Sequence, residues 1–310
     1  MKCLSTMGLW AWLCICLVLL LAASTTAQPP SEPLSAPTPA IGDIRSQTMS
    51  TNDRKVFLSV LPGNFKFPPD DAGKVLLREY GAVFIAAGGA IAPDKVIFRD
   101  ESEVMAFQDR VEKRTEMIGG MSMTLQTPAM NALLAAISEA GVQRLEITPR
   151  DTDAASRSYF ESVSLWLSRV EPGLQHWINK KRISPEDATR IRSMPIEEQV
   201  VEILRLEKKG LFFSKDLTKS ILYSVAPPGT SQHLSMLAFD VKEYESQRIR
   251  SIMEKHGWFQ TVISDLPHFT YLGVPESKLS TRGLKMVVNS GRKYWVPDLA
   301  ADDLVVSTGD

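Results

Sequence analysis

The chain has 310 residues, of which 44% are hydrophobic and 23% are charged. Its 35 lysines and arginines nearly balance its 36 aspartates and glutamates, so the formal net charge is −1. Because there is no basic stripe and no lysine- and arginine-rich run, nucleic acid is a poor candidate partner. From about residue 55 onward the chain suits one large domain, or one domain with an elaborated N-terminal part.

The N-terminal segment has the pattern of an export signal. Lys2 precedes an apolar run from about Gly8 to Ala23, and the small residues Thr25-Thr26-Ala27 follow. These are the charged, apolar and cleavage regions of a secretory signal. We therefore expect residues 1–27 to be a signal peptide. We expect the protein to be exported, periplasmic or in the cell envelope or extracellular space, with no stable membrane span after cleavage. An uncleaved anchor is the alternative, although the apolar run is short for a span.

The cysteines and the next segment limit the chemistry and the domain boundaries. Cys3, Cys14 and Cys16 all lie in the signal segment, so a metal site in the mature protein must use histidines and carboxylates. Residues 28–54 are rich in proline, serine, threonine and alanine, which is typical of a disordered linker. We expect residues 55–120 to form an N-terminal part or sheet addition, and residues 121–310 to form the main domain.

The first predicted elements are short strands. Residues 56–61, 82–87 and 96–98 are short apolar runs with β-branched residues and flanking breakers, which favour strands, although periodicity alone does not separate them from buried helix. The first clear helix begins at Thr127-Pro128, with an N-cap residue and a proline at the first helical position, and ends at Gly141. Residues 142–147 then predict a strand.

The middle of the chain predicts helices. Apolar residues recur at helical spacing from Ser156 to about Arg169. Ser184 followed by proline and acidic residues begins a second helix, and Pro195–Lys209 forms a third that ends at Gly210.

The C-terminal third predicts short strands around one helix. We expect strands over residues 221–225, 258–263 and 269–272, and a helix over residues 242–256. Pro227-Pro228-Gly229 predicts a turn. Helices beside short strands indicate the α+β class, and we expect a mostly antiparallel sheet bearing a zinc site, with flanking helices.

Two histidines and one aspartate predict that zinc site. His233, Asp240 and His268 offer two imidazoles and one carboxylate, and a catalytic zinc ion takes three protein ligands and a water. Asp265 and His268 flank Pro267, which disfavours a helix interior and favours a turn or strand entry. Asp265 supplies a second carboxylate that could take a proton from the water.

The spacing of the ligands requires a bend. His233 and Asp240 are seven residues apart, so on one regular strand their side chains would face opposite sides. The upstream Pro-Pro-Gly and the β-favouring residues 237–239 favour a loop followed by a strand, with a helix as the alternative. On spacing alone, each histidine could instead be a surface or core residue, because no HExxH or cysteine-pair signature is present.

The same residues carry a family resemblance. Ser231-x-His233-x6-Asp240 resembles the SxHxxGxAxD motif of the lysostaphin and D-alanyl-D-alanine metallopeptidase group. Asp265-x-x-His268 is similar to the second motif of that group, an acidic residue three positions before the last zinc histidine. The resemblance implies His233, Asp240 and His268 as zinc ligands and Asp265 as the catalytic base and acid.

An upstream segment extends the resemblance. Arg157-Ser158-Tyr159 resembles the helix start of the D-alanyl-D-alanine carboxypeptidase family, in which the arginine lies in the active site. The resemblance implies Arg157 as a catalytic and substrate-binding residue and Ser231 as a further substrate contact. It also implies that residues 121–310 are a zinc peptidase-like domain whose substrate partner is a peptidoglycan stem peptide.

Two departures from the family pattern leave the reaction open. Met236 replaces the usual glycine of the first motif, which would mean a changed turn if that glycine holds a shape only glycine adopts easily. Asp265 and Pro267 replace the glutamate and tryptophan usual in the carboxypeptidases, and Asp-x-Pro-His looks like the version in L-alanyl-D-glutamate endopeptidases. The scissile bond is therefore either the terminal D-Ala-D-Ala bond or a bond within the stem. A non-catalytic cell-wall-binding module of the same fold is the alternative.

Overall fold

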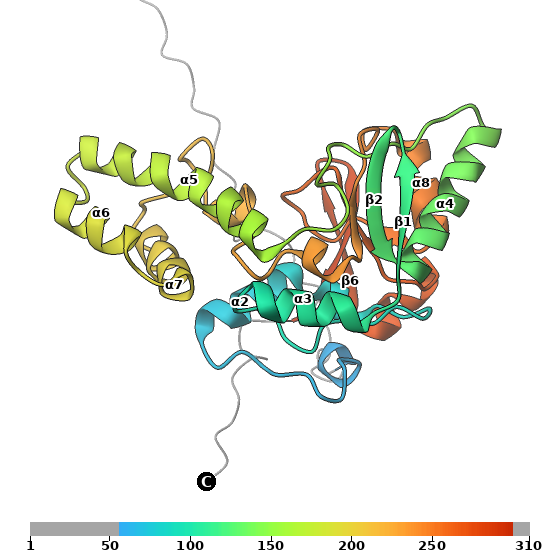
Figure 1. The fold of residues 1–310 in the computed structure, drawn as a ribbon, viewed down its shortest axis with the longest axis horizontal. Helices are drawn as coiled ribbons and strands as arrows, with labels where there is room; N and C mark the ends of the chain where they lie inside the picture. The colour runs from blue at the N-terminus through green and yellow to red at the C-terminus, as the bar shows by residue number, and fades with distance from the viewer. Residues whose placement is uncertain (1–55, 300–310) are drawn as a thin grey trace, which may run out of the picture. The chain divides into compact units, whose positions relative to one another are not determined.

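The computed structural model describes residues 56–299 of the chain. The expected signal peptide over residues 1–27, the expected linker over residues 28–54 and all three cysteines lie outside the described residues. The fold is α+β, as the sequence predicted, with helices beside small antiparallel sheets (Figure 1). Within the described range, no helix has both the length and the apolar character needed to cross a membrane.

The helices and strands alternate irregularly along the chain. The α-helices are α2 (Asp71–Tyr80), α3 (Glu101–Arg110), α4 (Thr127–Val142), α5 (Tyr159–Asn179), α6 (Pro185–Arg192), α7 (Ile196–Glu207) and α8 (Gln247–Lys255). The short 3-10 helices are η1 (Gly81–Ile85), η2 (Ile221–Tyr223), η3 (Gln232–Ser235), η4 (Glu276–Lys278) and η5 (Ser280–Arg282). The strands are β1 (Lys113–Ile118), β2 (Met121–Gln126), β3 (Ala238–Asp240), β4 (Trp258–Phe259), β5 (His268–Tyr271), β6 (Leu284–Asn289) and β7 (Arg292–Pro297). They form two antiparallel hairpins, β1–β2 and β6–β7, and one three-stranded antiparallel sheet in the order β3-β5-β4.

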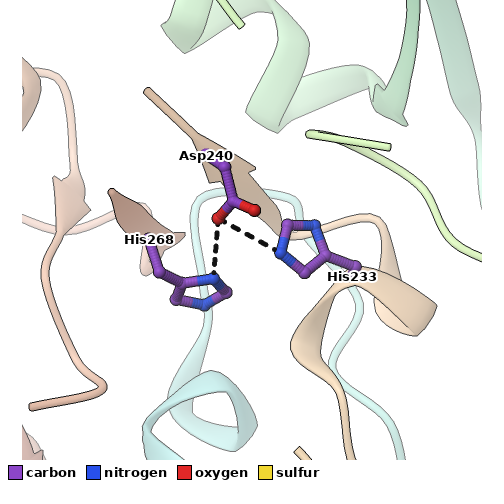
Figure 2. A group of neighbouring side chains, drawn as sticks. All are labelled: His233, Asp240 and His268. Atoms are coloured by element: carbon purple, nitrogen blue, oxygen red, sulfur yellow. Dashed lines mark hydrogen bonds and ion pairs between the residues drawn. The ribbon is translucent and has the colours of Figure 1, made fainter. Parts of the chain in front are cut away.

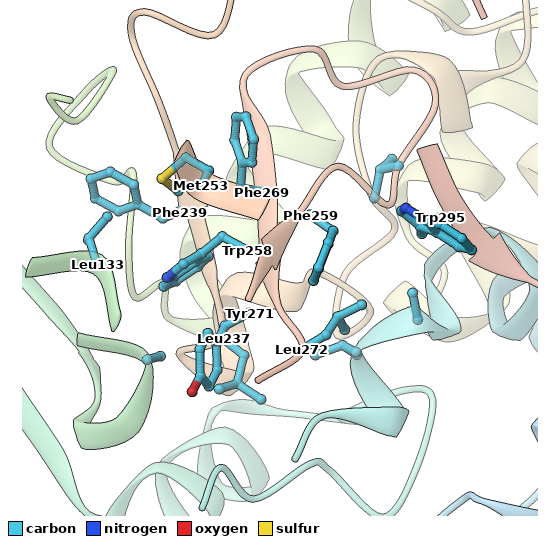
Figure 3. Close-up of a cluster of buried hydrophobic side chains, with 14 of the residues drawn as sticks. Leu133, Leu237, Phe239, Met253, Trp258, Phe259, Phe269, Tyr271, Leu272 and Trp295 are labelled. Atoms are coloured by element: carbon cyan, nitrogen blue, oxygen red, sulfur yellow. The ribbon is translucent and has the colours of Figure 1, made fainter. Parts of the chain in front are cut away.

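The three-stranded sheet has one apolar face and one polar face. Asp240 pairs with His268 and Phe239 pairs with Phe269 across β3 and β5. Since successive side chains on a strand point to opposite faces, the two phenylalanines lie on the face opposite the aspartate and the histidine. Both rings are fully buried and lie near Trp258 in the main core (Figure 3). Burial of this aromatic face fixes the register of the sheet.

The main core draws on the whole described chain. Leu76 in α2 and Ile85 in η1 belong to the same buried cluster as Leu133 in α4, Phe239 in β3 and Leu284 in β6. The N-terminal part of the described chain therefore shares one core with the sheet that carries Asp240 and His268.

A second buried cluster lies within the α5–α7 lobe, which we define as residues 159–225. Trp166 is fully buried and donates a hydrogen bond from Nε1 to Gln199 Oε1 at 2.9 Å. The amide of Gln199 in turn donates to the carbonyl of Ile191 at 3.1 Å. Gly173 lets α5 approach closely, because a Cβ there would lie 2.3 Å from the ring of Phe213. The lobe thus has its own tightly packed interior.

The helix start predicted at Ser184 is confirmed, whereas the helix predicted from Thr127 has Gln126 as its N-cap, and the helix predicted from Ser156 to about Arg169 extends from Tyr159 to Asn179. Ser158 caps α5 in a reciprocal capping box with Glu161, and Ser184 caps α6 through the backbone N–H of Asp187. The helix expected over residues 242–256 is shorter, because its N-cap is Ser246.

Several predicted strands are wrong. Residues 56–59 are helical, residues 82–85 belong to η1 and residues 221–223 form η2. No strand forms over residues 96–98 or 142–147. The side chains of Phe57, Ile85 and Ile221 are fully buried in these turns, and a short buried turn is as apolar as a buried strand.

Other strand boundaries also differ from the prediction. The strand expected over residues 258–263 is confined to Trp258–Phe259, whereas the strand expected over residues 269–272 is confirmed as β5. The hairpins β1–β2 and β6–β7 were not predicted from the sequence. Gly119-Gly120 and Ser290-Gly291 connect them with backbones at positive φ.

Candidate metal centre

The expected ligands converge at one end of the three-stranded sheet. His233 comes from η3, Asp240 from the end of β3 and His268 from the start of β5 (Figure 2). Asp240 and His268 are direct cross-strand partners, which places their side chains on the same face of the sheet. One ligand atom of each of the three residues lies within 4.8 Å of the other two. The sequence prediction that these residues meet is therefore confirmed.

The predicted bend between the first two ligands lies at Met236. This residue has φ 56° and ψ 32°, in the left-handed region, and it ends η3 before β3 begins. Its side chain is 1% exposed and packs in a cluster with Leu234. Methionine therefore adopts here a backbone conformation that glycine adopts more easily. Between His233 and Asp240 the chain forms a loop and then a strand, as the sequence favoured.

The distances fit a first-row metal ion. Asp240 Oδ1 lies 3.3 Å from His233 Nε2 and 3.1 Å from His268 Nδ1. Tetrahedral zinc with bonds of about 2.0–2.1 Å to nitrogen and oxygen would separate its ligand atoms by about 3.3 Å. All three residues are buried, with 2%, 9% and 4% of the surfaces of His233, Asp240 and His268 exposed. The cluster therefore has the dimensions of a metal site with side chains already in position.

The tautomer of His233 follows from its backbone partner. Its Nδ1 lies 2.7 Å from the carbonyl oxygen of Ala155. A carbonyl oxygen only accepts hydrogen bonds, so Nδ1 carries the proton and donates it. The other ring nitrogen, Nε2, consequently presents a lone pair toward Asp240.

The tautomer of His268 follows from Gln232. The side-chain nitrogen of Gln232 donates to the carbonyl of Tyr80 at 2.8 Å, which orients the amide oxygen toward His268 and Thr270. That oxygen lies 2.9 Å from His268 Nε2 and also accepts from the hydroxyl of Thr270. Because the amide oxygen only accepts, His268 carries its proton on Nε2. Its Nδ1 then presents a lone pair toward Asp240.

Three acceptor atoms therefore face one another with no donor between them. Burial lowers the pKa of His233, and the positive charge of Arg157 adds to this effect, so the ring is neutral. Two imidazole lone pairs and one carboxylate buried together require a cation for compensation. The cluster could hold a metal ion.

A cavity of about 580 Å³ opens beside the cluster. Its lining includes all six residues that the sequence analysis singled out, namely Arg157, Ser231, His233, Asp240, Asp265 and His268. The volume lies in the range of ordinary small-ligand sites. The structure thus brings the complete predicted set to one cavity.

Asp265 lies in the turn that leads into β5, as its spacing from His268 predicted. The backbone N–H of His268 donates to the carbonyl of Asp265 at 3.3 Å. Burial raises the pKa of the Asp265 carboxyl to about 6, and the nearby negative charge of Asp240 contributes to the rise. A carboxyl group with a pKa close to neutrality can accept a proton and release it again.

Arg157 connects the start of α5 to the metal cluster. Its Nη2 donates to Asp153 Oδ2 at 3.0 Å and lies 3.7 Å from Asp240 Oδ2. Its Nη1 donates to the Ser231 hydroxyl at 3.5 Å. The Nε atom is buried and has no hydrogen-bond partner among the described residues. Arg157 therefore places positive charge and an unused donor beside the cluster.

The supporting residues were not found from the sequence. Gln232 and the Ala155 carbonyl fix the two tautomers, and Asp153 holds the arginine. Asp153 and Arg157 are four residues apart but both precede α5, so the helical i,i+4 rule gives no local signal for this contact either.

No protein-family model, curated protein or solved structure matches this chain. The structure itself provides a buried cluster of His233, Asp240 and His268 that could hold a metal ion. It also places Asp265 and Arg157 in the adjoining cavity.

Proposed function

We propose that this chain is an exported zinc peptidase that hydrolyses peptidoglycan stem peptides. The main support for metal-dependent chemistry is the set of three acceptor atoms of His233, Asp240 and His268 that face one another. The choice of peptidase and of substrate class is supported by the spacing of these ligands and of Asp265 in the sequence. The signal-like N-terminal segment supports export.

The donor set fits zinc. Two imidazole nitrogens and one carboxylate oxygen are common protein ligands of catalytic zinc. When bound, zinc supplies Lewis-acid polarisation of a carbonyl group and lowers the pKa of water. Two histidines and one carboxylate also occur at non-haem iron(II) sites, so a metal titration with both ions tests the assignment.

Asp265 is suited to move the proton during hydrolysis. Its raised pKa allows the carboxylate to take a proton from the attacking water and then to give it to the nitrogen of the leaving amine. Arg157 is suited to stabilise the negative charge that develops on the carbonyl oxygen, because a guanidinium donates charge-assisted hydrogen bonds. Ser231 and Asp153 keep the arginine beside the cluster.

The first experiment measures metal content and cleavage of the full chain. We expect one zinc ion per chain, loss of peptide cleavage after chelation and recovery on adding zinc. Mass spectrometry of products from defined stem peptides distinguishes loss of one terminal D-alanine from cleavage within the stem. Zinc binding without cleavage of any stem peptide, together with binding to sacculi, would favour the non-catalytic wall-binding module over the peptidase.

The second experiment separates the proton-transfer role from metal binding. The Asp265→Asn variant should keep one zinc ion, while its turnover falls by about 10²–10⁴-fold, as expected when a general base is lost. The matched control is Asp109→Asn, because Asp109 is exposed on α3 and does not line the cavity. Wild-type turnover in the Asp265→Asn variant would show that another group carries the proton.

A further inference from the structure

The charges around the cavity are unevenly distributed. Its acidic lining residues all come from segments outside the α5–α7 lobe: Asp151, Asp153, Asp240 and Asp265. The lobe contributes two cations to the lining, Arg169 and Lys215, and no carboxylate. Neither cation forms an ion pair with a carboxylate in the described part of the chain. One side of the cavity therefore has uncompensated positive charge.

Ser224 links the side chain of Arg169 to the backbone of Lys215. Its hydroxyl accepts from Arg169 Nε at 3.2 Å and from the backbone N–H of Lys215 at 3.2 Å. Arg169 Nη1 donates to the Ser168 hydroxyl at 2.8 Å. Within residues 56–299, only neutral hydroxyl groups bind the guanidinium, whose positive charge remains available to a ligand.

The loop that carries Lys215 is anchored from inside the lobe. Glu207 is 8% exposed. Its Oε1 accepts from the backbone N–H groups of Phe213 at 3.0 Å and Ile221 at 2.7 Å, and its Oε2 accepts from the Ser220 hydroxyl at 2.5 Å. These bonds fix both ends of the loop over residues 213–221. The position of Lys215 is consequently set by a buried carboxylate, which is a costly group to bury without a structural purpose.

We infer that Arg169 and Lys215 form a subsite that binds a carboxylate group of the substrate. This inference rests on the proposed function, because the peptide whose scissile bond lies at the metal cluster must extend along the same cavity toward the lobe. A guanidinium and an ammonium together form charge-assisted hydrogen bonds to a carboxylate. The subsite selects peptides that carry a free carboxylate over the same peptides with that group amidated.

Two carboxylates of a stem peptide could fill the subsite. One is the free C-terminal carboxylate, and the other is a carboxylate on a residue within the stem. The chemistry is the same in both cases. Two probes separate them: one peptide amidated only at the C-terminus and one amidated only at the internal carboxylate.

The test measures binding of fluorescently labelled stem peptides to the full-length, zinc-loaded chain. The wild-type protein should bind the unmodified peptide about tenfold or more tightly than one of the two amidated peptides, corresponding to one charge-assisted hydrogen bond. Arg169→Gln and Lys215→Gln should lose most of this preference and leave the affinity for that amidated peptide unchanged. Arg182→Gln is the control, because Arg182 is an exposed arginine of the same lobe outside the cavity lining. Zinc content and melting temperature confirm that each variant is folded.

The outcomes separate this inference from the proposed function. Equal affinity of the wild-type protein for all three peptides would overturn the subsite even if the protein cleaves them. A preference that persists in both glutamine variants would also overturn it. A charge preference that depends on Arg169 in a protein without peptidase activity would support the subsite and overturn the peptidase proposal.

Discussion

Gln232 offers the sharpest test of the tautomer argument. Its amide oxygen accepts from His268 Nε2 at 2.9 Å and from the Thr270 hydroxyl, and its nitrogen donates to the Tyr80 carbonyl at 2.8 Å. Gln232→Leu preserves the approximate side-chain volume and removes all three hydrogen bonds. The variant therefore leaves the His268 ring free to take the other tautomer or to rotate.

The expected magnitude follows from the groups that lose their partners. The Thr270 hydroxyl retains Thr261 as a partner at 2.6 Å, whereas the His268 N–H and the Tyr80 carbonyl lose the bonds from Gln232. Two buried groups at about 1–3 kcal/mol each give a destabilisation of about 2–6 kcal/mol. Loss of the partner that orients a metal-binding histidine typically weakens metal affinity by about 10–100-fold.

A second buried glutamine provides the matched control. Gln199 is 1% exposed, compared with 3% for Gln232, and it bonds to Trp166 and Ile191 inside the α5–α7 lobe. Gln199→Leu should also destabilise the fold and leave zinc affinity unchanged. Zinc affinity is measured by competition with a chromogenic chelator, and stability by denaturant unfolding of the zinc-free proteins.

The comparison distinguishes positioning from general stability. Equal zinc affinity in the Gln232→Leu variant and the wild-type protein would refute the conclusion that Gln232 fixes the ring of His268. An equal loss of zinc affinity in both leucine variants would show that this loss results from reduced stability alone. The protonated nitrogen of His268 can be identified directly from the nitrogen chemical shifts of the ring.

Three further substitutions test the local structure. Met236→Gly relieves a left-handed backbone worth about 1–2 kcal/mol but removes a side chain whose burial is worth about 2–5 kcal/mol, so urea unfolding should show a net loss of stability of up to about 4 kcal/mol. Gly229→Ala should lower the free energy of unfolding by about 2 kcal/mol or more and weaken zinc binding, because φ is +79° and the new Cβ would lie 2.0 Å from the Phe98 carbonyl oxygen. An unchanged unfolding midpoint would contradict the turn geometry. Burial raises the pKa of Glu207 above its ordinary value of 4.5. Glu207 therefore contributes to the stability of the folded wild-type protein in full below pH 4.5. This contribution is lost as the pH rises through the folded-state pKa of Glu207. The melting temperature of the Glu207→Gln variant minus that of the wild-type protein should consequently increase from pH 4.5 to 7.5. A constant difference across that range would exclude the raised pKa.

The candidate ligands were predictable from the sequence because metal chemistry restricts the choice of residues. Without cysteines after Cys16, the site had to use histidine and carboxylate, and the chain has only four histidines. The bend between His233 and Asp240 followed from the twofold periodicity of strands. Ser184 similarly marked the start of a helix, because an N-cap acts within one turn of the chain.

The remaining features depend on contacts between distant parts of the chain. Gln232 bonds to Tyr80, which lies 152 residues earlier, and no local pattern encodes that contact. The apolar run at residues 82–87 was mistaken for a strand because burial on all sides removes the periodicity that distinguishes the elements. Arg169 was likewise indistinguishable from an ordinary helix-surface arginine until the cavity was seen.

The pairing of β3 with β5 links assembly of the metal-binding cluster to correct folding. A slip of β3 by one residue against β5 would turn Asp240 into the apolar interior, away from His268, and expose Phe239 to the cavity. No partly shifted arrangement retains both the aromatic packing and the inward-facing acceptors. A chain that folds incorrectly at this sheet would be unable to capture the ion, so the proposed activity would depend on prior assembly of the interior.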